Sequence, residues 1–275
     1  MQKEGSKLFR CISIIFLALI TVVFVFPFYW IITGSFKTRL DSLQLPPQWI
    51  PLHPTTESWQ TLFKQPAFQW LWNSIFISVM TMLLVCIVST MAGYVLAKKR
   101  FKGGKLLFAI FVFAMALPKQ VVLVPLVKQI SFMGLHNTVW AVILSSIGWP
   151  FGIFLMKQFS ETVPTELLEA ARIDGCSEFK TFLKVVVPIV KPGIAALAIF
   201  TFISSWNDYF LQLIMLNDRN KLTLQLGLAT LQGEFDTNYG LLMAGAALSA
   251  LPIIIMFLAF QKHFTQGITI GAVKG

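Results

Sequence analysis

Apolar residues gather in six long runs along the chain, separated by shorter polar segments that carry most of the charges. A helix needs about 20 mostly apolar residues to cross a bilayer, and each run supplies roughly that number. The pattern predicts an all-α membrane protein with six transmembrane helices in a single domain over residues 1–275. The predicted spans are residues 11–33, 73–97, 106–127, 138–156, 194–216 and 241–260.

In the third and fourth runs a proline lies next to polar or glycine residues, which favours an interruption of the helix. Pro118 stands in the third run and is followed by two polar residues, so we expect this span to be broken or tilted near its end. In the fourth run Gly148 and Gly152 have a spacing that allows close helix packing, whereas Pro150 between them favours a kink. Both interpretations of the fourth run stay open.

The first run is interpreted as a membrane span and not as a cleaved signal. Its start is basic, but it continues through the large residues of 26–30 with no small-residue cleavage site. The apolar region of a signal peptide is typically about 7–15 residues long. We therefore expect an uncleaved first helix.

Composition supports the membrane interpretation and gives it an orientation. Hydrophobic residues make up 56% of the chain and charged residues 12%, whereas soluble domains carry about 25% charged residues. The net charge of +10 comes from short basic clusters at the ends of apolar runs, which is typical of membrane topology and not of a nucleic-acid surface. Of the 22 Lys and Arg residues, 15 lie in four segments: before the first span, between the second and third spans, between the fourth and fifth spans, and after the sixth span. These segments, and hence both termini, are predicted to face the cytoplasm.

Catalytic and metal-binding patterns are missing from the sequence. The three Cys and three His residues are scattered, with no CxxC, HExxH or GxSxG, so we expect no metal site and no intramembrane enzyme. The nearest approach to a phosphate-binding loop, Gly103-Gly104-Lys105, is followed by Leu106 and lacks the first glycine. It is interpreted as a tight basic turn, which leaves the chain without an ATP site of its own.

The segment between spans four and five, residues 157–193, is patterned as two short helices. Pro164 stands at a helix start, Glu166 and Glu169 lie in the early turns, and Gly175 follows the end. A second helix is predicted to begin near Ser177 and to end before Pro188. An apolar stripe on this second helix consists of Phe179, Phe182, Leu183 and Val186.

Such an amphipathic pair has three explanations: it lies on lipid headgroups, it packs on the protein's own helices, or it docks into a soluble partner. Its polar residues carry charges of both signs, which disfavours the lipid surface. The other two explanations stay open from the pattern alone.

Three motifs resemble those of permease subunits of ABC importers, in the carbohydrate-uptake branch that includes the second maltose permease. The first is Glu169-Ala170-Ala171 with Gly175 and Pro188, the second is Trp206-Asn207-Asp208, and the third is the tail Gly267–Gly275. In that family the loop forms coupling helices seated in a cleft of the ATPase subunit. The resemblance assigns this contact to Glu169, Ala170, Ala171, Ile173, Asp174, Gly175 and Pro188.

The resemblance also implies the rest of the assembly. The tail, residues 261–275, is expected to be cytoplasmic and extended between partner subunits, with contacts from Gly267, Gly271, Val273, Lys274 and Gly275. The expected partners are a second and different permease, two ATPase subunits that bind ATP and Mg, and an extracytoplasmic solute-binding protein. This chain would bind no cofactor and would form half of a pathway for a sugar or related solute in a bacterial cell membrane.

The polar triplet of the fifth span has two interpretations. At 1.5 Å per residue, Asn207 and Asp208 lie about 20 Å into a core of about 30 Å, where an acid should avoid lipid. Trp206, Asn207 and Asp208 would then offer a stacking ring and hydrogen bonds to a solute, or Asp208 would tie neighbouring helices together. An ion-coupled secondary transporter is the alternative function, although the broken third span is the only feature that favours it.

Overall fold

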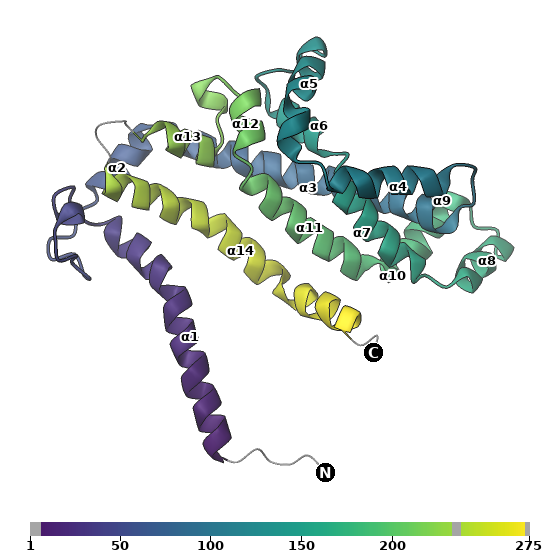
Figure 1. Cartoon of the computed structure of the whole chain (residues 1–275), viewed down its shortest axis with the longest axis horizontal. Coiled ribbons are helices and arrows are strands. Elements are labelled where there is room, and N and C mark those ends of the chain that lie inside the picture. The colour runs from purple at the N-terminus through teal and green to yellow at the C-terminus, as the bar shows by residue number, and fades with distance from the viewer. Residues whose placement is uncertain (1–6, 233–237, 273–275) are drawn as a thin grey trace. The chain divides into compact units, whose positions relative to one another are not determined.

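The computed structural model describes residues 7–232 and 238–272, and every regular element in these ranges is helical. The prediction of an all-α protein is therefore confirmed (Figure 1). The α-helices are α1 Lys7–Gly34, α2 Glu57–Lys64, α3 Ala67–Lys98, α4 Gly104–Met115, α5 Lys119–Phe132, α6 Val139–Ser146, α7 Pro150–Glu161, α8 Thr165–Ile173, α9 Glu178–Thr181, α10 Val187–Ile189, α11 Lys191–Trp206, α12 Phe210–Met215, α13 Leu224–Thr230 and α14 Tyr239–Ala272. Between them lie the 3-10 turns η1 Asp41–Leu43 and η3 Arg219–Lys221 and a π-helical segment η2 Phe182–Val186.

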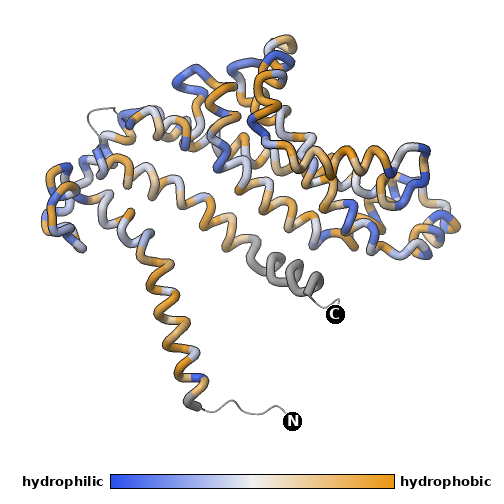
Figure 2. The backbone as a smooth tube through the Cα atoms, in the orientation of Figure 1, coloured by the Kyte–Doolittle hydropathy of each residue, from blue (hydrophilic) through white to orange (hydrophobic). Residues whose placement is uncertain are grey.

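Among the described residues, three straight segments are long and apolar enough to cross a membrane: Phe9–Gly34, Ala67–Lys98 and Tyr239–Ala259. Three further candidates are pairs of helices joined at a bend, so up to six spans result when each pair counts as one. Figure 2 shows the apolar character of α1 along most of its length. None of the apolar window of α1 is buried, which suits a helix that faces lipid.

The break predicted in the third run is present, and of the two interpretations left open for the fourth run the kink is also present. The chain bends by 108° between α4 and α5, just before Lys119, and by 44° between α6 and α7. Pro118 precedes the first residue of α5, and Pro150 is itself the first residue of α7. Proline suits a helix start because its missing N–H would have no partner there.

The fifth span is not the continuous helix that was predicted for residues 194–216. Helix α11 ends at Trp206, and α12 begins at Phe210. The buried Gln212 side chain donates to the Ser205 carbonyl across 3.0 Å and accepts from Thr223, while Asp208 Oδ1 accepts from the Leu211 amide across 3.2 Å. Side chains thus replace helical hydrogen bonds, which the apolar pattern of the run does not reveal.

Two other predicted boundaries are wrong. The second loop helix does not end before Pro188, because π-helical turns over Phe182–Val186 carry it on through α10 to Ile189. Pro188 has no backbone N–H and therefore donates no hydrogen bond within the helix. The wider π-helical turns before it cost no hydrogen bond at this residue. The tail was predicted to be extended, but it is helical up to Ala272, where α14 ends. Val273, Lys274 and Gly275 lie outside the described residues.

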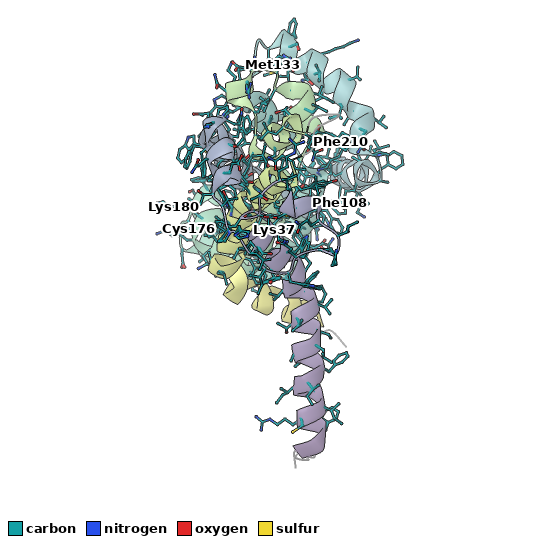
Figure 3. The ribbon with its side chains drawn as sticks, turned by 90° about the vertical axis from the view of Figure 1, so that its left-hand side faces the viewer. Lys37, Phe108, Met133, Cys176, Lys180 and Phe210 are labelled. Atoms are coloured by element: carbon teal, nitrogen blue, oxygen red, sulfur yellow. The ribbon has the colours of Figure 1, made fainter. Side chains whose placement is uncertain are left out.

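The chain forms two compact units. One comprises residues 1–67 and 228–251, and its segment after α1 is ordered by side-chain contacts. Tyr29 donates to the Trp49 carbonyl across 2.7 Å, the Trp59 indole donates to Ser35, and the Lys37 ammonium lies 4.2 Å from the centre of the Trp30 ring. Figure 3 shows Lys37 beside the end of α1.

The second unit comprises residues 68–227 and 252–275 and contains both candidate sites. Its core joins α3 to α7, α11 and the loop segment between them. The clustered buried side chains are Val85, Cys86, Tyr94, Met156, Val163, Leu168, Phe182, Val186, Val190, Leu197 and Ala198.

Candidate functional site

The first candidate site is the loop that contains α8 and α9, and glycine ends its first helix as predicted. Gly175 has φ +76°, which an L side chain rarely adopts. The Gly175 amide donates to the Arg172 carbonyl across 3.0 Å, and the Cys176 amide donates to the Ala171 carbonyl across 2.9 Å. These two bonds form a Schellman motif that satisfies the last carbonyls of α8.

One face of the loop packs on the protein's own helices. Leu168 and Ala171 of α8 are buried, as are Phe182 and Val186 of the following segment. The Phe182 ring lies 5.5 Å from the Tyr94 ring of α3, measured between centroids. The buried half of the loop is therefore part of the core and is held in a fixed position.

The opposite face of the loop is exposed. Glu169, Ala170 and Asp174 are exposed, and the Ile173 side chain is 87% exposed. Leu167, Phe179 and Leu183 also leave much of their apolar surface uncovered in the chain by itself. A face packed on the protein's own helices and an exposed face thus occur together on opposite sides of one helix pair.

A single carboxylate connects this loop to the end of α3. Glu178 Oε2 lies 2.5 Å from Lys99 Nζ and 3.4 Å from the Tyr94 hydroxyl, and Glu178 Oε1 lies 3.0 Å from Arg172 Nη2. The hydrogen bond from Lys99, together with its charge and that of Arg172, lowers the pKa of Glu178 below its ordinary value of 4.5. No pattern in the sequence indicates this cluster, because only the fold brings Lys99 to Glu178.

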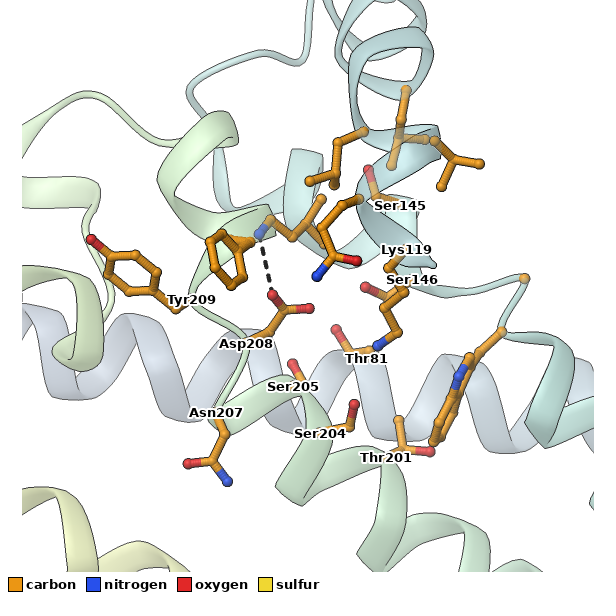
Figure 4. Close-up of a pocket in the computed structure, with 18 of the residues that line it drawn as sticks. Thr81, Lys119, Ser145, Ser146, Thr201, Ser204, Ser205, Asn207, Asp208 and Tyr209 are labelled. Carbon is orange, nitrogen blue, oxygen red and sulfur yellow. Dashed lines mark hydrogen bonds between the residues drawn. The ribbon is translucent and has the colours of Figure 1, made fainter. Parts of the chain in front are cut away.

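The second candidate site is a cavity of about 730 Å³ in the same unit. It lies where α5 and α7 begin, where α6 and α11 end, and beside the middle of α3 (Figure 4). Three interruptions that are far apart in sequence, before Lys119, before Pro150 and after Trp206, therefore meet around one space. Broken helices at membrane depth are tolerated where they are buried in protein or line such a cavity.

Most of the cavity surface is apolar, but polar side chains from several elements also line it. The hydroxyls of Thr81 and Thr201 are buried and have no hydrogen-bond partner among the described residues. Lys119 and Asp208 bring one charge of each sign. The polar or charged lining residues are Thr81, Lys119, Gln120, Ser145, Ser146, Thr201, Ser204, Ser205, Asn207, Asp208 and Tyr209.

The predicted triplet of the fifth span is divided by the structure. Asn207 and Asp208 line the cavity, whereas the Trp206 side chain is buried outside it and stacks on Phe202 with ring centroids 5.9 Å apart. The indole that does line the cavity belongs to Trp149, which the sequence analysis did not select. A Trp next to Gly148 and Pro150 at a predicted kink was the signal available in the sequence.

Comparison with known proteins decides the family. The model of the family described as "binding-protein-dependent transport system inner membrane component" matches residues 89–270, which is well over half of the chain. The chain belongs to this family. It is thus a transport permease, and membership removes the ion-coupled secondary transporter as an alternative.

Relatives match this permease over its whole length. The arabinooligosaccharides transport system permease protein AraQ of Halalkalibacterium halodurans is 34% identical, with 100% of both chains covered. The melibiose/raffinose/stachyose import permease protein MelC of Bacillus subtilis is 33% identical, also with 100% of both chains covered.

Solved structures support the fold. A chain in the crystal structure of a bacterial ABC transporter for import of the acidic polysaccharide alginate matches with a TM-score of 0.82 and 21% identity, covering 96% of the permease and 99% of that chain. At this identity the match shows the fold alone.

The predicted contact residues of the permease gather at the loop, apart from the tail. Glu169, Ala170, Ile173, Asp174 and Gly175 lie on or beside the exposed side of α8, while Ala171 is buried against the core. Pro188 is exposed in α10, and Gly267 and Gly271 belong to α14. No group of three or more His, Cys, Asp or Glu residues suited to a metal is present in residues 7–232 and 238–272.

Proposed function

We propose that this permease is one of two membrane subunits of a bacterial ABC importer and carries a sugar or sugar-like solute. The observation that supports this best is the coexistence, in one unit, of a cavity between broken helices, lined in part by polar side chains, and a helix pair with one packed and one exposed face. A cavity between broken helices can hold a solute on its way across the membrane. An exposed helix face gives a separate ATPase subunit a surface to bind. The sugar class rests on the relatives, whose names refer to arabinooligosaccharides and to raffinose and related sugars.

The exposed face of α8 is proposed as the contact with a separate ATPase subunit, which binds ATP and Mg. Glu169 would pair there with a basic group or cap a helix of the ATPase, and Ile173 would insert its exposed side chain into an apolar hollow. Ala170 is small enough for close approach, and Gly175 allows the tight turn into α9. The tail residues Gly267, Gly271, Val273, Lys274 and Gly275 are proposed as a second contact with the ATPase subunits.

Helices α7 and α11 would transmit the movement of the loop. Helix α7 has 12 residues and leads from the cavity at Pro150 to the loop, and α11 has 16 residues and leads from the loop back to the cavity at Trp206. At 1.5 Å per residue α7 covers about 18 Å. Because both ends of the loop continue into helices that reach the cavity, a shift of α8 as a rigid body would alter the cavity.

The remaining assembly follows from the same proposal. A second, different permease would complete the pathway, and an extracytoplasmic binding protein would deliver the solute. Asn207 and Asp208 would contact the solute along the pathway, and the complex would lie in the bacterial cell membrane. The basic segments would face the cytoplasm, with both termini inside.

The test is affinity purification of the full chain from detergent-solubilised membranes, followed by mass spectrometry of the retained proteins. The wild type is expected to retain an ATPase and a second permease. The amount of ATPase retained by Glu169→Lys should be at least about tenfold lower than the amount retained by the wild type. The reason is that removal of one charged contact costs about 1.5–3 kcal/mol of binding free energy. The second permease should remain, because its contact with this chain does not depend on Glu169.

The matched control is Glu57→Lys, the same charge reversal at an exposed position of α2. It should retain both partners at wild-type levels. A folded wild-type chain that is recovered alone or only with copies of itself would overturn the proposed function. Retention of the ATPase by a folded Glu169→Lys variant would overturn the assignment of the coupling site only.

A further inference from the structure

The chain between α3 and α4, residues 98–105, is a basic turn. It contains Lys98, Lys99, Arg100, Lys102 and Lys105 and no acidic residue. We propose that this basic turn binds the headgroups of anionic phospholipids, and that Arg100, Lys102 and Lys105 make the contacts. Clusters of about four to eight Lys and Arg residues directly beside a membrane helix attract such lipids. The inference goes beyond the proposed function, because it requires neither an ATPase subunit nor a solute.

Two of the five cations are used inside the protein. The Lys99 ammonium pairs with Glu178 across 2.5 Å, and the Lys98 ammonium donates to the Glu161 carbonyl across 3.1 Å. These contacts hold the end of α3 against the loop and against the end of α7. Lys98 and Lys99 are therefore assigned to the fold and not to the lipid.

The other three cations have no counterion in the protein. Arg100, Lys102 and Lys105 are exposed, and none of them forms an ion pair within residues 7–232 and 238–272. The first turn of α4 also contains no acidic residue. Three positive charges within six residues thus remain available to an anion from outside the chain.

The surroundings of these charges favour a lipid over a soluble anion. Leu106, Ile110 and Phe113 lie at i, i+4 and i+7 of α4, so they share one face of the helix, and all three are exposed. Figure 2 shows the largely apolar character of α4. An apolar stripe that begins at a basic turn suits a phospholipid, whose acyl chains would cover the stripe while its headgroup meets the charges. A soluble anion would leave the stripe in water.

The shape of the turn keeps an aromatic ring among the charges. Gly103 has φ +89°, which allows the chain to reverse directly before α4. A Cβ at Gly104 would lie 3.1 Å from the Phe101 ring, so the ring packs over the start of the helix. Phe101 is still 45% exposed and stands between Arg100 and Lys102 in the sequence. An aromatic ring flanked by long basic side chains is typical of the headgroup region of a membrane.

The test is native mass spectrometry of the purified full chain, with the subunits that co-purify, in a non-ionic detergent. The probes are dioleoylphosphatidylglycerol, which is anionic, and dioleoylphosphatidylcholine, which has no net charge. The wild type should bind the anionic lipid at lower concentrations than the uncharged one. The triple variant Arg100→Gln, Lys102→Gln and Lys105→Gln should weaken binding of the anionic lipid at least about fivefold, the effect expected for about 1 kcal/mol.

The matched control removes the same total charge from exposed lysines elsewhere. Lys64→Gln, Lys128→Gln and Lys180→Gln lie on α2, α5 and α9, far from one another in the sequence. This combination should bind both lipids as the wild type does, because the turn stays intact. Melting temperatures in detergent without added lipid show whether both triple variants are folded. A third probe, soluble glycerol 3-phosphate, should not displace the bound anionic lipid, because it offers nothing to the apolar stripe.

Four results would overturn the inference. The wild type binds the two lipids equally well, the folded variant of the basic turn binds the anionic lipid like the wild type, the control loses as much binding as that variant, or glycerol 3-phosphate displaces the lipid. The third result would indicate an effect of net charge alone, and the fourth a simple anion site. If the ATPase and the second permease co-purify with a chain that shows no preference for the anionic lipid, the importer remains and the lipid site is lost.

Discussion

At the scale of single residues, Glu178 connects the loop to the membrane helices. Its carboxylate contacts Lys99 at the end of α3, Arg172 near the end of α8 and the Tyr94 hydroxyl. An isolated exposed ion pair contributes little to stability, because water screens it. Here, however, one carboxylate bridges three elements, so its loss should loosen their relative position more than it changes the global free energy of unfolding.

Replacement of Glu178 by Gln should therefore speed amide hydrogen exchange in α8 and α9 at pH 7. Because the folded pKa of Glu178 lies below 4.5, its contribution is complete above about pH 4.5 and is lost as the pH falls through the folded pKa. The difference between wild type and Glu178→Gln, compared at equal pH, should close in that acidic range. Glu161→Gln is the control, because the Glu161 carboxylate pairs with Lys157 of the same helix, α7. A difference that persists unchanged in acid would contradict this role.

At the scale of elements, the contact of α3 with α7 depends on glycine. A Cβ at Gly93 would lie 2.6 Å from backbone atoms of Met156 and Lys157, and one at Gly152 would lie 2.5 Å from Ser89 Oγ. The predicted close packing of the fourth run therefore exists at Gly152, whereas a Cβ at Gly148 would meet nothing within 4 Å. Since α7 carries the loop at its far end, this close contact also fixes where the loop begins.

The change Gly93→Ala should destabilise the permease by about 1–3 kcal/mol, because backbone atoms cannot move aside as a flexible side chain can. Thermal unfolding in detergent would measure this as a lower melting temperature. Gly148→Ala inserts the same methyl group into open space and should leave the melting temperature unchanged. Equal effects of the two substitutions would show that helix packing is not what Gly93 provides.

At the scale of the whole molecule, topology decides which segments can meet which partners. The excess of Lys and Arg predicts that the loop and both termini face the cytoplasm and that the segment containing α2 faces the outside. The proposed ATPase contact requires this orientation, because ATP is available in the cytoplasm. Labelling of cysteines at known positions tests it directly.

A membrane-impermeant maleimide should label Glu57→Cys in intact cells but should label Cys176 only after the membrane is opened. The background for both measurements replaces Cys11 and Cys86, of which Cys11 is exposed and Cys86 is buried. Detergent-treated samples control for reactivity, since Cys176 is only partly exposed. Labelling of Cys176 in intact cells would invert the topology and exclude the proposed coupling.

The sequence by itself determined the elements whose causes are local. Apolar length predicted the membrane helices, Pro118 and the polar residues after it predicted a break, Pro150 favoured a kink, and Pro164 and Gly175 predicted the limits of α8, because each of these residues acts on its own backbone. The motif of Glu169-Ala170-Ala171 with Gly175 and Pro188 pointed to the family, because it is a short pattern that can be read from the sequence directly. Local composition could not reveal that the fifth run breaks after Trp206, since the bonds of Gln212 to Ser205 and Thr223 form only in the folded chain.

Only the tertiary structure decided which distant residues share a site. It brought three helix interruptions around one cavity, placed Trp149 there and buried Trp206 elsewhere, and joined Lys99 to Glu178. It also divided α8 into a packed face and a free one. A hydropathy pattern gives the length of a membrane helix, but because all faces of such a helix are apolar, its rotation and its neighbours are set by close packing and by paired polar groups.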